Sequence, residues 1–156
     1  MAGHTVRAQR DILAEPAEVW AVITDLERLA RALNSVESIE RLEGTGFAPG
    51  VSWRETRRML GKLDSEVMTV AAVEPVSVVV LHAQSKGSTY ETRYELAPSS
   101  LGSRLSIAFG AETSQASAGQ KLAWAVLGPL GAKAAKAALE KDLEDIALAV
   151  ETHYRR

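Results

Sequence analysis

The stretch TVRAQRDILAEPAEVWAVITDLERLARALNS, residues 5–35, changes its hydrophobic period from that of a strand to that of a helix. Up to Leu13, apolar residues recur at even positions, which is the period of a half-buried strand. Pro16 then suits the first turn of a helix, and apolar residues follow it at helical spacing. Asp25 can cap a second short helix, which runs through Leu33. The stretch therefore predicts a strand followed by two short helices.

Beyond residue 35, short apolar segments with turn residues between them favour an antiparallel sheet. Most of the connections contain Gly or Pro, and short, even connections are typical of a meander. Six further strands are predicted, over residues 36–42, 51–60, 63–73, 76–85, 88–96 and 104–111.

The last part of the chain is rich in alanine and is predicted to form one long helix. Ser117 and Gln120 form a capping-box pattern at its start, and Gly128-Pro129 should kink or restart it. One apolar stripe should cover the sheet, and it consists of Leu139, Leu143, Ile146 and Val150. The flank or outer face should carry the charged residues Glu140, Lys141, Glu144 and Asp145. The whole order predicts an α+β fold.

Length and composition fit a single domain over residues 1–156, since 46% of the residues are apolar and 24% are charged. The formal net charge of −2 gives no field that would attract nucleic acid or an anionic membrane, so neither partner is expected. Cysteine is absent, which excludes disulfides and thiolate chemistry. Residues 1–10 lack the apolar core of a signal peptide, so we expect a cytoplasmic protein without stable membrane insertion. The oligomeric state stays open.

Several short patterns follow one another in order along nearly the whole chain. The first are Ala14-Glu15-Pro16, Val19-Trp20-Ala21-Val22, Asp25, the stretch WRETRRM at residues 53–59 with Gly61, and Glu74-Pro75. The later ones are Gly102-Ser103-Arg104, Gly128-Pro129-Leu130 and Asp142-Leu143. In this order the chain resembles the helix-grip superfamily (START/Bet v 1-like, or SRPBCC), which includes START lipid-transfer domains, birch-pollen-allergen-like proteins and polyketide cyclases. The resemblance is to its polyketide cyclase/dehydrase-like branch.

The resemblance implies a curved seven-stranded antiparallel sheet, two short helices after the first strand, and a long C-terminal helix packed across the sheet. It also implies an internal pocket between the sheet and that helix for a hydrophobic or aromatic small molecule, such as a lipid or a polyketide. It implies no single reaction, because the superfamily contains carriers, receptors, cyclases and hydrolase-activating subunits.

Strand alternation selects the side chains that share the pocket-facing side with apolar neighbours. The candidates for ligand binding are Trp53, Glu55, Arg57, His82, Tyr90, Tyr94 and Phe109. His82 faces inward if Val78 and Val80 do, whereas the equally apolar residues at 79, 81 and 83 would turn it outward. Trp124 is a further candidate, because the start of the long helix commonly lines the pocket mouth in the proteins that this chain resembles.

Glu55 and Arg57 lie two residues apart on one face of one strand, where an unpaired buried charge would be costly. In one interpretation Arg57 holds a carboxylate, phenolate or enolate oxygen of the ligand, and Glu55 orients it. In the other, the two residues form a mutual salt bridge near the rim of the sheet. Tyr90 and Tyr94 would add hydroxyls to the same wall. His82 is either a general base or a hydrogen-bonded wall residue.

Motifs for other chemistry are missing from the sequence. The histidines lack metal-ligand spacing, and Gly44-Thr45-Gly46 lacks the strand, third glycine and helix of a dinucleotide-binding turn. No Gly-x-Ser-x-Gly elbow occurs. We therefore expect no metal and no cofactor.

Three functions remain open. The leading one is a carrier or sensor that binds a hydrophobic or aromatic small molecule without obligate catalysis. The enzymatic alternative is a polyketide cyclase or dehydratase-like activity in which Arg57, Glu55 or His82 assists proton transfer. The third is a regulatory or interaction module with a collapsed pocket. Small side chains leave space beside the sheet or permit close packing against it, and they are Ala134, Ala135, Ala137 and Ala138.

Overall fold

The computed structural model describes residues 5–59, 61–85, 88–112 and 129–154. Its sheet consists of seven antiparallel strands in the order β1-β7-β6-β5-β4-β3-β2. The strands are β1 (Thr5–Ile12), β2 (Val36–Glu43), β3 (Ser52–Met59), β4 (Lys62–Glu74), β5 (Val78–Ser85), β6 (Ser88–Ser99) and β7 (Gly102–Glu112). The helices are α1 (Pro16–Ile23), α2 (Leu26–Ala32) and α4 (Pro129–Tyr154).

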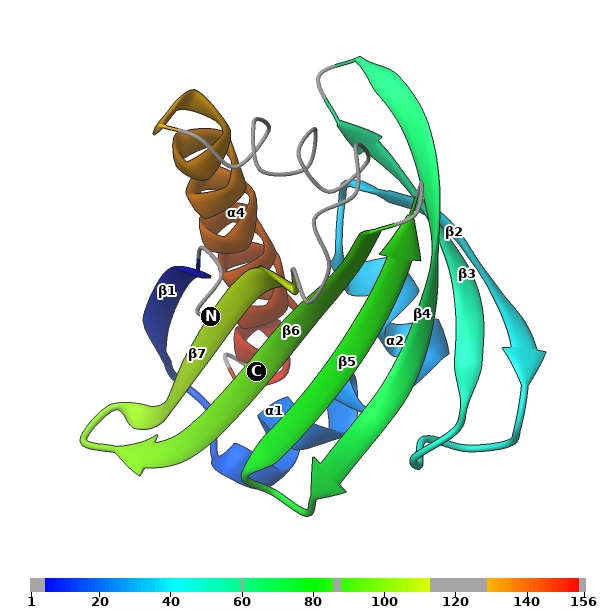
Figure 1. The fold of residues 1–156 in the computed structure, drawn as a ribbon. Helices are drawn as coiled ribbons and strands as arrows, with labels where there is room; N and C mark the ends of the chain where they lie inside the picture. The colour runs from blue at the N-terminus through cyan, green and yellow to red at the C-terminus, as the bar shows by residue number, and fades with distance from the viewer. Residues whose placement is uncertain (1–4, 60, 86–87, 113–128, 155–156) are drawn as a thin grey trace.

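The sheet curves strongly, and α4 lies along its concave side (Figure 1). The helices α1 and α2 connect β1 to β2, the two edge strands, and both contact α4. This arrangement confirms the predicted helix-grip α+β fold. None of the helices in the described part of the chain combines the length and the apolarity that a bilayer crossing needs.

The two short helices begin where the sequence predicts. Pro16 opens α1, and the side chains that α1 buries include Val19 and Val22. The Asp25 carboxylate caps α2 by accepting hydrogen bonds from the backbone N–H groups of Glu27 and Arg28, at 3.0 and 3.1 Å. Each of these short helices buries one apolar face.

Most strand boundaries differ from the prediction by one to three residues, and two of these differences involve Val76 and Pro98. The strand β5 starts at Val78 instead of residue 76, because Val76 has a left-handed backbone with φ of 67° and belongs to the turn after β4. The strand β6 extends past residue 96 to Ser99 and includes Pro98. Beyond Glu95, β6 pairs only with β7, so the missing N–H group of proline leaves no ladder bond unmade on the β5 side.

The turn between β6 and β7 is tied to the segment that follows β1. Gly102 has a positive φ of 133°, and a Cβ atom there would lie 2.7 Å from the Ala14 carbonyl oxygen. The next residue, Ser103, is fully buried and donates a hydrogen bond of 2.6 Å from its hydroxyl to the same oxygen. The Gly-Ser pair therefore permits and then fixes a close backbone approach.

The helix α4 buries the predicted apolar stripe, because Leu139, Leu143, Ile146 and Val150 all belong to the core. One prediction for this helix is wrong, since Asp145 is only 2% exposed and does not lie on the outer face. Its carboxylate accepts hydrogen bonds from the backbone and side-chain nitrogens of Asn34 at 2.9 and 3.1 Å. Asp145 thus joins α4 to the end of α2. The predicted helix start at Ser117 and the kink residue Gly128 lie outside the described residues.

Candidate ligand-binding cavity

A cavity of about 150 Å³ lies between the concave face of the sheet and α4. Residues from α2, β3, β4, β5, β6, β7 and α4 line it. One group of these residues is apolar and consists of Leu29, Leu33, Met68, Leu81, Phe109, Ala135, Ala138 and Leu139. The other group is polar and consists of Glu55, Arg57, Glu66, Thr92, Tyr94 and Asp142. The cavity therefore combines apolar walls with a cluster of charged and hydroxyl groups.

Two alanines on α4 contribute to this space. Ala135 and Ala138 line the cavity, so of the two roles that small side chains permit, leaving space is the one seen at these positions. Ala134 and Ala137 are exposed and do not contribute to it. The open volume thus results from small residues at two positions of the buried helix face.

The polar part of the cavity is built around Arg57 on β3. Its Nε donates a hydrogen bond of 2.7 Å to Glu55 Oε2, and its Nη1 donates to both carboxylate oxygens of Asp142 at 3.0 and 3.1 Å. Nη1 also donates to Ser35 Oγ at 3.1 Å. Burial by itself would lower the pKa of Arg57, but the charges of Asp142 and Glu55 outweigh it and raise that pKa. Arg57 is therefore a permanent cation held between two carboxylates.

Glu55 and Asp142 are both almost completely buried, with side chains 8% exposed. Burial raises the pKa of Asp142, while Arg57 opposes that rise. Glu55 receives a second hydrogen bond, of 3.2 Å, from Trp53 Nε1. Trp53 itself is fully buried and packs against Phe47, with ring centroids 6.1 Å apart. Trp53 thus helps to hold the Glu55 carboxylate in position.

Glu66 on β4 is the cross-strand partner of Glu55. Burial, together with the charges of Glu55 and Asp64, raises the pKa of Glu66. Within the described ranges, no residue forms a hydrogen bond or an ion pair with its carboxylate, although the charge of Arg57 acts on it at longer range. Two carboxylates that face each other across a ladder repel, so Glu66 lies where a positive charge would be favourable.

Tyr94 on β6 lies beside the same cluster and is 7% exposed. Burial raises the pKa of its phenol, and the charge of Asp142 acts in the same direction. The hydroxyl therefore stays protonated at neutral pH. Tyr94 lines the cavity. A phenol in such a position can donate a hydrogen bond to a bound molecule or accept one from it.

The predicted candidates fall into four groups. Glu55, Arg57, Tyr94 and Phe109 line the cavity, as strand parity indicates. Trp53 and Tyr90 contact residues of the lining: Trp53 donates a hydrogen bond to Glu55, and Tyr90 stacks on Phe109 with ring centroids 5.5 Å apart. Trp124 lies outside the described residues. His82 forms the fourth group: of the two orientations that the sequence leaves open, the structure shows the outward one, and this candidate for ligand binding does not line the cavity.

His82 points to the outer side of the sheet, where its Nε2 lies 3.3 Å from Glu91 Oε1 and its side chain is 44% exposed. The side chains of β5 in the core cluster are Val79, Leu81 and Ala83, which have the opposite parity, although Val80 is also only 8% exposed. Because residues 78–81 are all apolar, alternation alone does not decide which set faces inward.

Two residues of the cluster, Asp142 and Glu66, were not among the predicted candidates. A signal for each exists in the sequence. Asp142 lies three residues after Leu139 and four before Ile146, so helical spacing places it on the buried stripe of α4. Glu66 shares the parity of Met68 and therefore lies on the inner face of β4.

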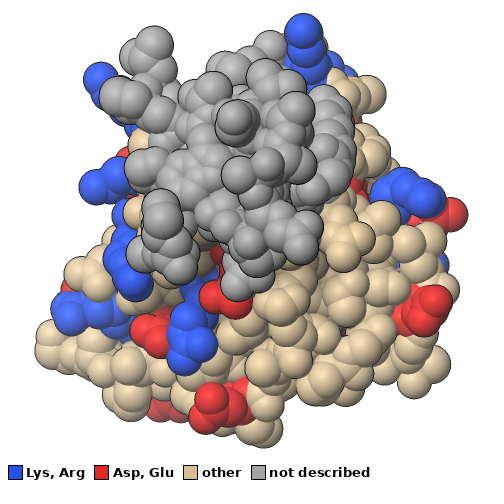
Figure 2. Space-filling model, viewed as in Figure 1, with Lys and Arg blue, Asp and Glu red and all other residues tan. Residues whose placement is uncertain are grey.

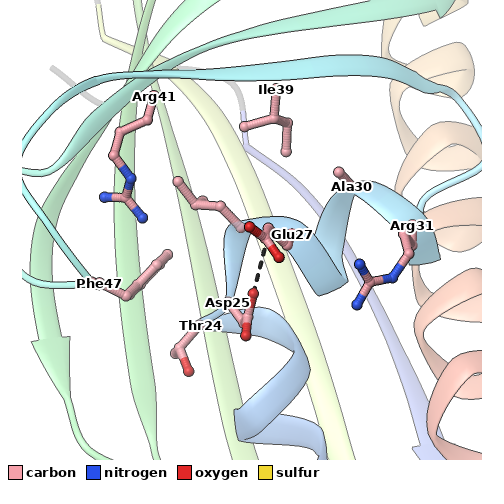
Figure 3. Close-up of a pocket in the computed structure, with 10 residues that line it drawn as sticks. Thr24, Asp25, Glu27, Ala30, Arg31, Ile39, Arg41 and Phe47 are labelled. Atoms are coloured by element: carbon pink, nitrogen blue, oxygen red, sulfur yellow. Dashed lines mark hydrogen bonds between the residues drawn. The ribbon is translucent and has the colours of Figure 1, made fainter.

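A second hollow of about 690 Å³ lies on the surface between α2, β2 and the loop after β2 (Figure 3). Its lining includes Asp25, Glu27, Arg31 and Arg41, all of which are exposed. Figure 3 also shows the Asp25 side chain bonded to the Glu27 backbone, so this carboxylate already serves as the α2 cap. The charges are hydrated and of both signs, and the hollow is poorly suited to an apolar ligand.

The outer surface carries no single-signed field on the side that Figure 2 shows, because acidic and basic side chains lie next to each other there. On the strands β2 and β3, for example, Arg54 pairs with Glu40 at 2.9 Å and Arg58 with Glu37 at 2.7 Å. These pairs are exposed and contribute little to stability. The internal cavity is therefore the strongest candidate for a site.

Comparisons with known proteins agree with this geometry. The family model described as "Polyketide cyclase / dehydrase and lipid transport" matches residues 3–151. No curated protein matches the chain. Solved structures do, among them TTHA0849 from Thermus thermophilus, with 23% identity, a TM-score of 0.76, and coverage of 96% of this chain and 99% of that one.

Two further solved structures share the fold at lower identity. A START superfamily protein from Mycobacterium smegmatis is 16% identical, with a TM-score of 0.76 and coverage of 96% of this chain and 99% of that one. Ara h 8.0201 is 17% identical, with a TM-score of 0.72 and coverage of 97% and 99%. At this identity the likeness establishes the fold alone.

Proposed function

Since this chain belongs to the polyketide cyclase / dehydrase and lipid transport family, we propose that it binds a hydrophobic or aromatic small molecule inside the cavity between the sheet and α4. The observation that carries the proposal is the cavity itself, which has apolar walls on several elements and a few polar groups at one side. Such a combination is typical of small-molecule sites, where apolar surface gives affinity and polar groups give orientation.

The size of the cavity limits what enters it. An apolar cavity of about 150 Å³ in a protein holds one benzene-sized molecule. The cavity here has the same volume, and Phe109, Leu81 and Met68 form part of its apolar walls. The part of the ligand that occupies it is therefore one aromatic ring or a short branched chain.

Binding fits the contacts of the cluster better than catalysis does. Glu55 and Arg57 are bonded to each other, and Arg57 is bonded again to Asp142. His82, the candidate general base of the enzymatic alternative, lies on the outer side of the sheet. A carrier or sensor needs no proton transfer from this cluster, so its ion pairs can stay as they are. Catalysis by the same residues would require these ion pairs to break.

The test uses toluene as a neutral probe of one ring, with binding detected by saturation-transfer NMR. Ala138→Phe fills the cavity from α4, and Ala138→Leu fills it less and guards against overpacking. Ala134→Phe is the matched control, because Ala134 is exposed one turn earlier on the same helix. Circular dichroism verifies that each variant is folded.

We expect saturation transfer to toluene from the wild type and from Ala134→Phe, and its loss in both Ala138 variants. The proposal fails if the folded wild-type protein transfers no saturation to toluene. It also fails if the Ala138 variants bind toluene as well as the wild type does, since the probe would then occupy another place.

A further inference from the structure

We propose that the ligand carries a protonated nitrogen, such as a primary amine, next to its apolar part, and that Glu66 and Tyr94 receive this group. The inference rests on the proposed function, because it names the polar chemistry of the molecule that occupies the same cavity. It concerns charge, whereas the proposed function concerns apolar volume.

Arg57 is the cation among the described residues that line the cavity, and two of its three guanidinium nitrogens are already occupied. Its Nε and Nη1 atoms donate to Glu55, Asp142 and Ser35 at distances between 2.7 and 3.1 Å. An anionic ligand would compete with two nearly buried carboxylates for the same guanidinium. It would also bring a negative charge next to the carboxyl groups of Glu55, Glu66 and Asp142, which line the same cavity.

Among the described residues that line the cavity, three carry carboxyl groups, Glu55, Glu66 and Asp142, and one is a cation, Arg57. Glu55 and Asp142 are satisfied by Arg57, whereas Glu66 forms no ion pair with any residue that the structure describes. A ligand ammonium group beside Glu66 would balance its charge and relieve the repulsion from Glu55 across the ladder.

Tyr94 supplies a second and independent reason. Its side chain is more than nine-tenths buried and lines the cavity, so its hydroxyl is a hydrogen-bonding group that a ligand in the cavity would meet. A protonated amine has several N–H donors, so it can donate to the phenolic oxygen and to a carboxylate at once. The apolar walls would then hold the ring or chain attached to that nitrogen.

The test compares three probes of one size: benzylamine, benzyl alcohol and benzoate. Dissociation constants are measured by NMR titration at neutral pH, where the amine is protonated. Glu66→Gln removes the charge and keeps the shape, and Tyr94→Phe removes only the hydroxyl. Glu43→Gln is the charge-matched control, because Glu43 is exposed on β2.

We expect the wild type to bind benzylamine roughly tenfold more tightly than benzyl alcohol, and benzoate least well. Glu66→Gln should reduce the preference for benzylamine over benzyl alcohol to about twofold. Tyr94→Phe should weaken the binding of benzylamine about fivefold. Glu43→Gln should leave the wild-type preference unchanged.

The inference is overturned if benzoate binds more tightly than benzyl alcohol, because Arg57 would then receive an anion. It is also overturned if Glu66→Gln keeps the preference that Glu43→Gln shows. In both cases binding of toluene and benzyl alcohol would leave the proposed function intact. If neither neutral probe binds, the proposed function fails as well.

Discussion

At the scale of single residues, the cluster around Arg57 connects the stability of the protein to its site. Two elements that are distant in the sequence, β3 and α4, are joined by the hydrogen bonds from Arg57 to Asp142. Both carboxylates next to Arg57 are nearly buried, so they depend on its charge. Removing one partner of such a group leaves an uncompensated buried charge.

Replacing Arg57 with methionine, which keeps most of the side-chain volume, should lower the free energy of unfolding by about 3 kcal/mol. The reason is that Glu55 and Asp142 would remain buried without a counter-charge. Urea denaturation measures the change. Arg54→Met is the control and should cost less than about 1 kcal/mol, because Arg54 forms an exposed pair with Glu40. Equal losses in the two variants would contradict this description of the cluster.

Residue positions can be predicted from the sequence where a strand alternates clearly. Alternation is sufficient for Glu55 and Arg57 on β3, and for Tyr94 and Phe109 on β6 and β7. It fails for His82, because its strand begins with four apolar residues and both parities fit. Alternation does not predict which side chains of different elements contact each other. The hydrogen bond from Arg57 on β3 to Asp142 on α4 is therefore seen only in the structure.

At the scale of elements, the turn between β4 and β5 is a local exception to good backbone geometry. Val76 has φ of 67°, a left-handed conformation that a β-branched residue rarely adopts. The turn is closed by a hydrogen bond of 3.0 Å from Ser77 N–H to the Glu74 carbonyl oxygen. The sequence predicts the strands on both sides but not this strain, because Val76 reads as the first residue of β5.

Val76→Asn should raise the free energy of unfolding by about 1 kcal/mol, since asparagine tolerates the left-handed region better than valine does. Little burial is lost, because Val76 is 42% exposed. Chemical denaturation tests the effect against Leu101→Asn, an exposed turn residue that does not have positive φ. If Val76→Asn lowers the free energy of unfolding instead, the contacts of the valine side chain stabilise the protein by more than its left-handed backbone destabilises it.

At the scale of the whole molecule, the curved sheet and α4 enclose a volume that no single element defines. The cavity is lined from helices at both ends of the sequence and from five strands. The order of elements, and thus the fold, follows from periodicity and turn residues. The volume does not, because it depends on how closely α4 approaches the sheet, which Asp145 and Asp142 help to fix through Asn34 and Arg57.

The most direct test of binding in the internal cavity is a crystal structure of the protein with bromobenzene, located by the anomalous scattering of bromine. We predict a bromine peak between the sheet and α4, next to Leu81, Phe109 and Ala138. Crystals of Ala138→Phe should lack that peak. Bromine found only in the surface hollow between α2 and β2, or an empty internal cavity in crystals saturated with bromobenzene, would contradict the proposed site.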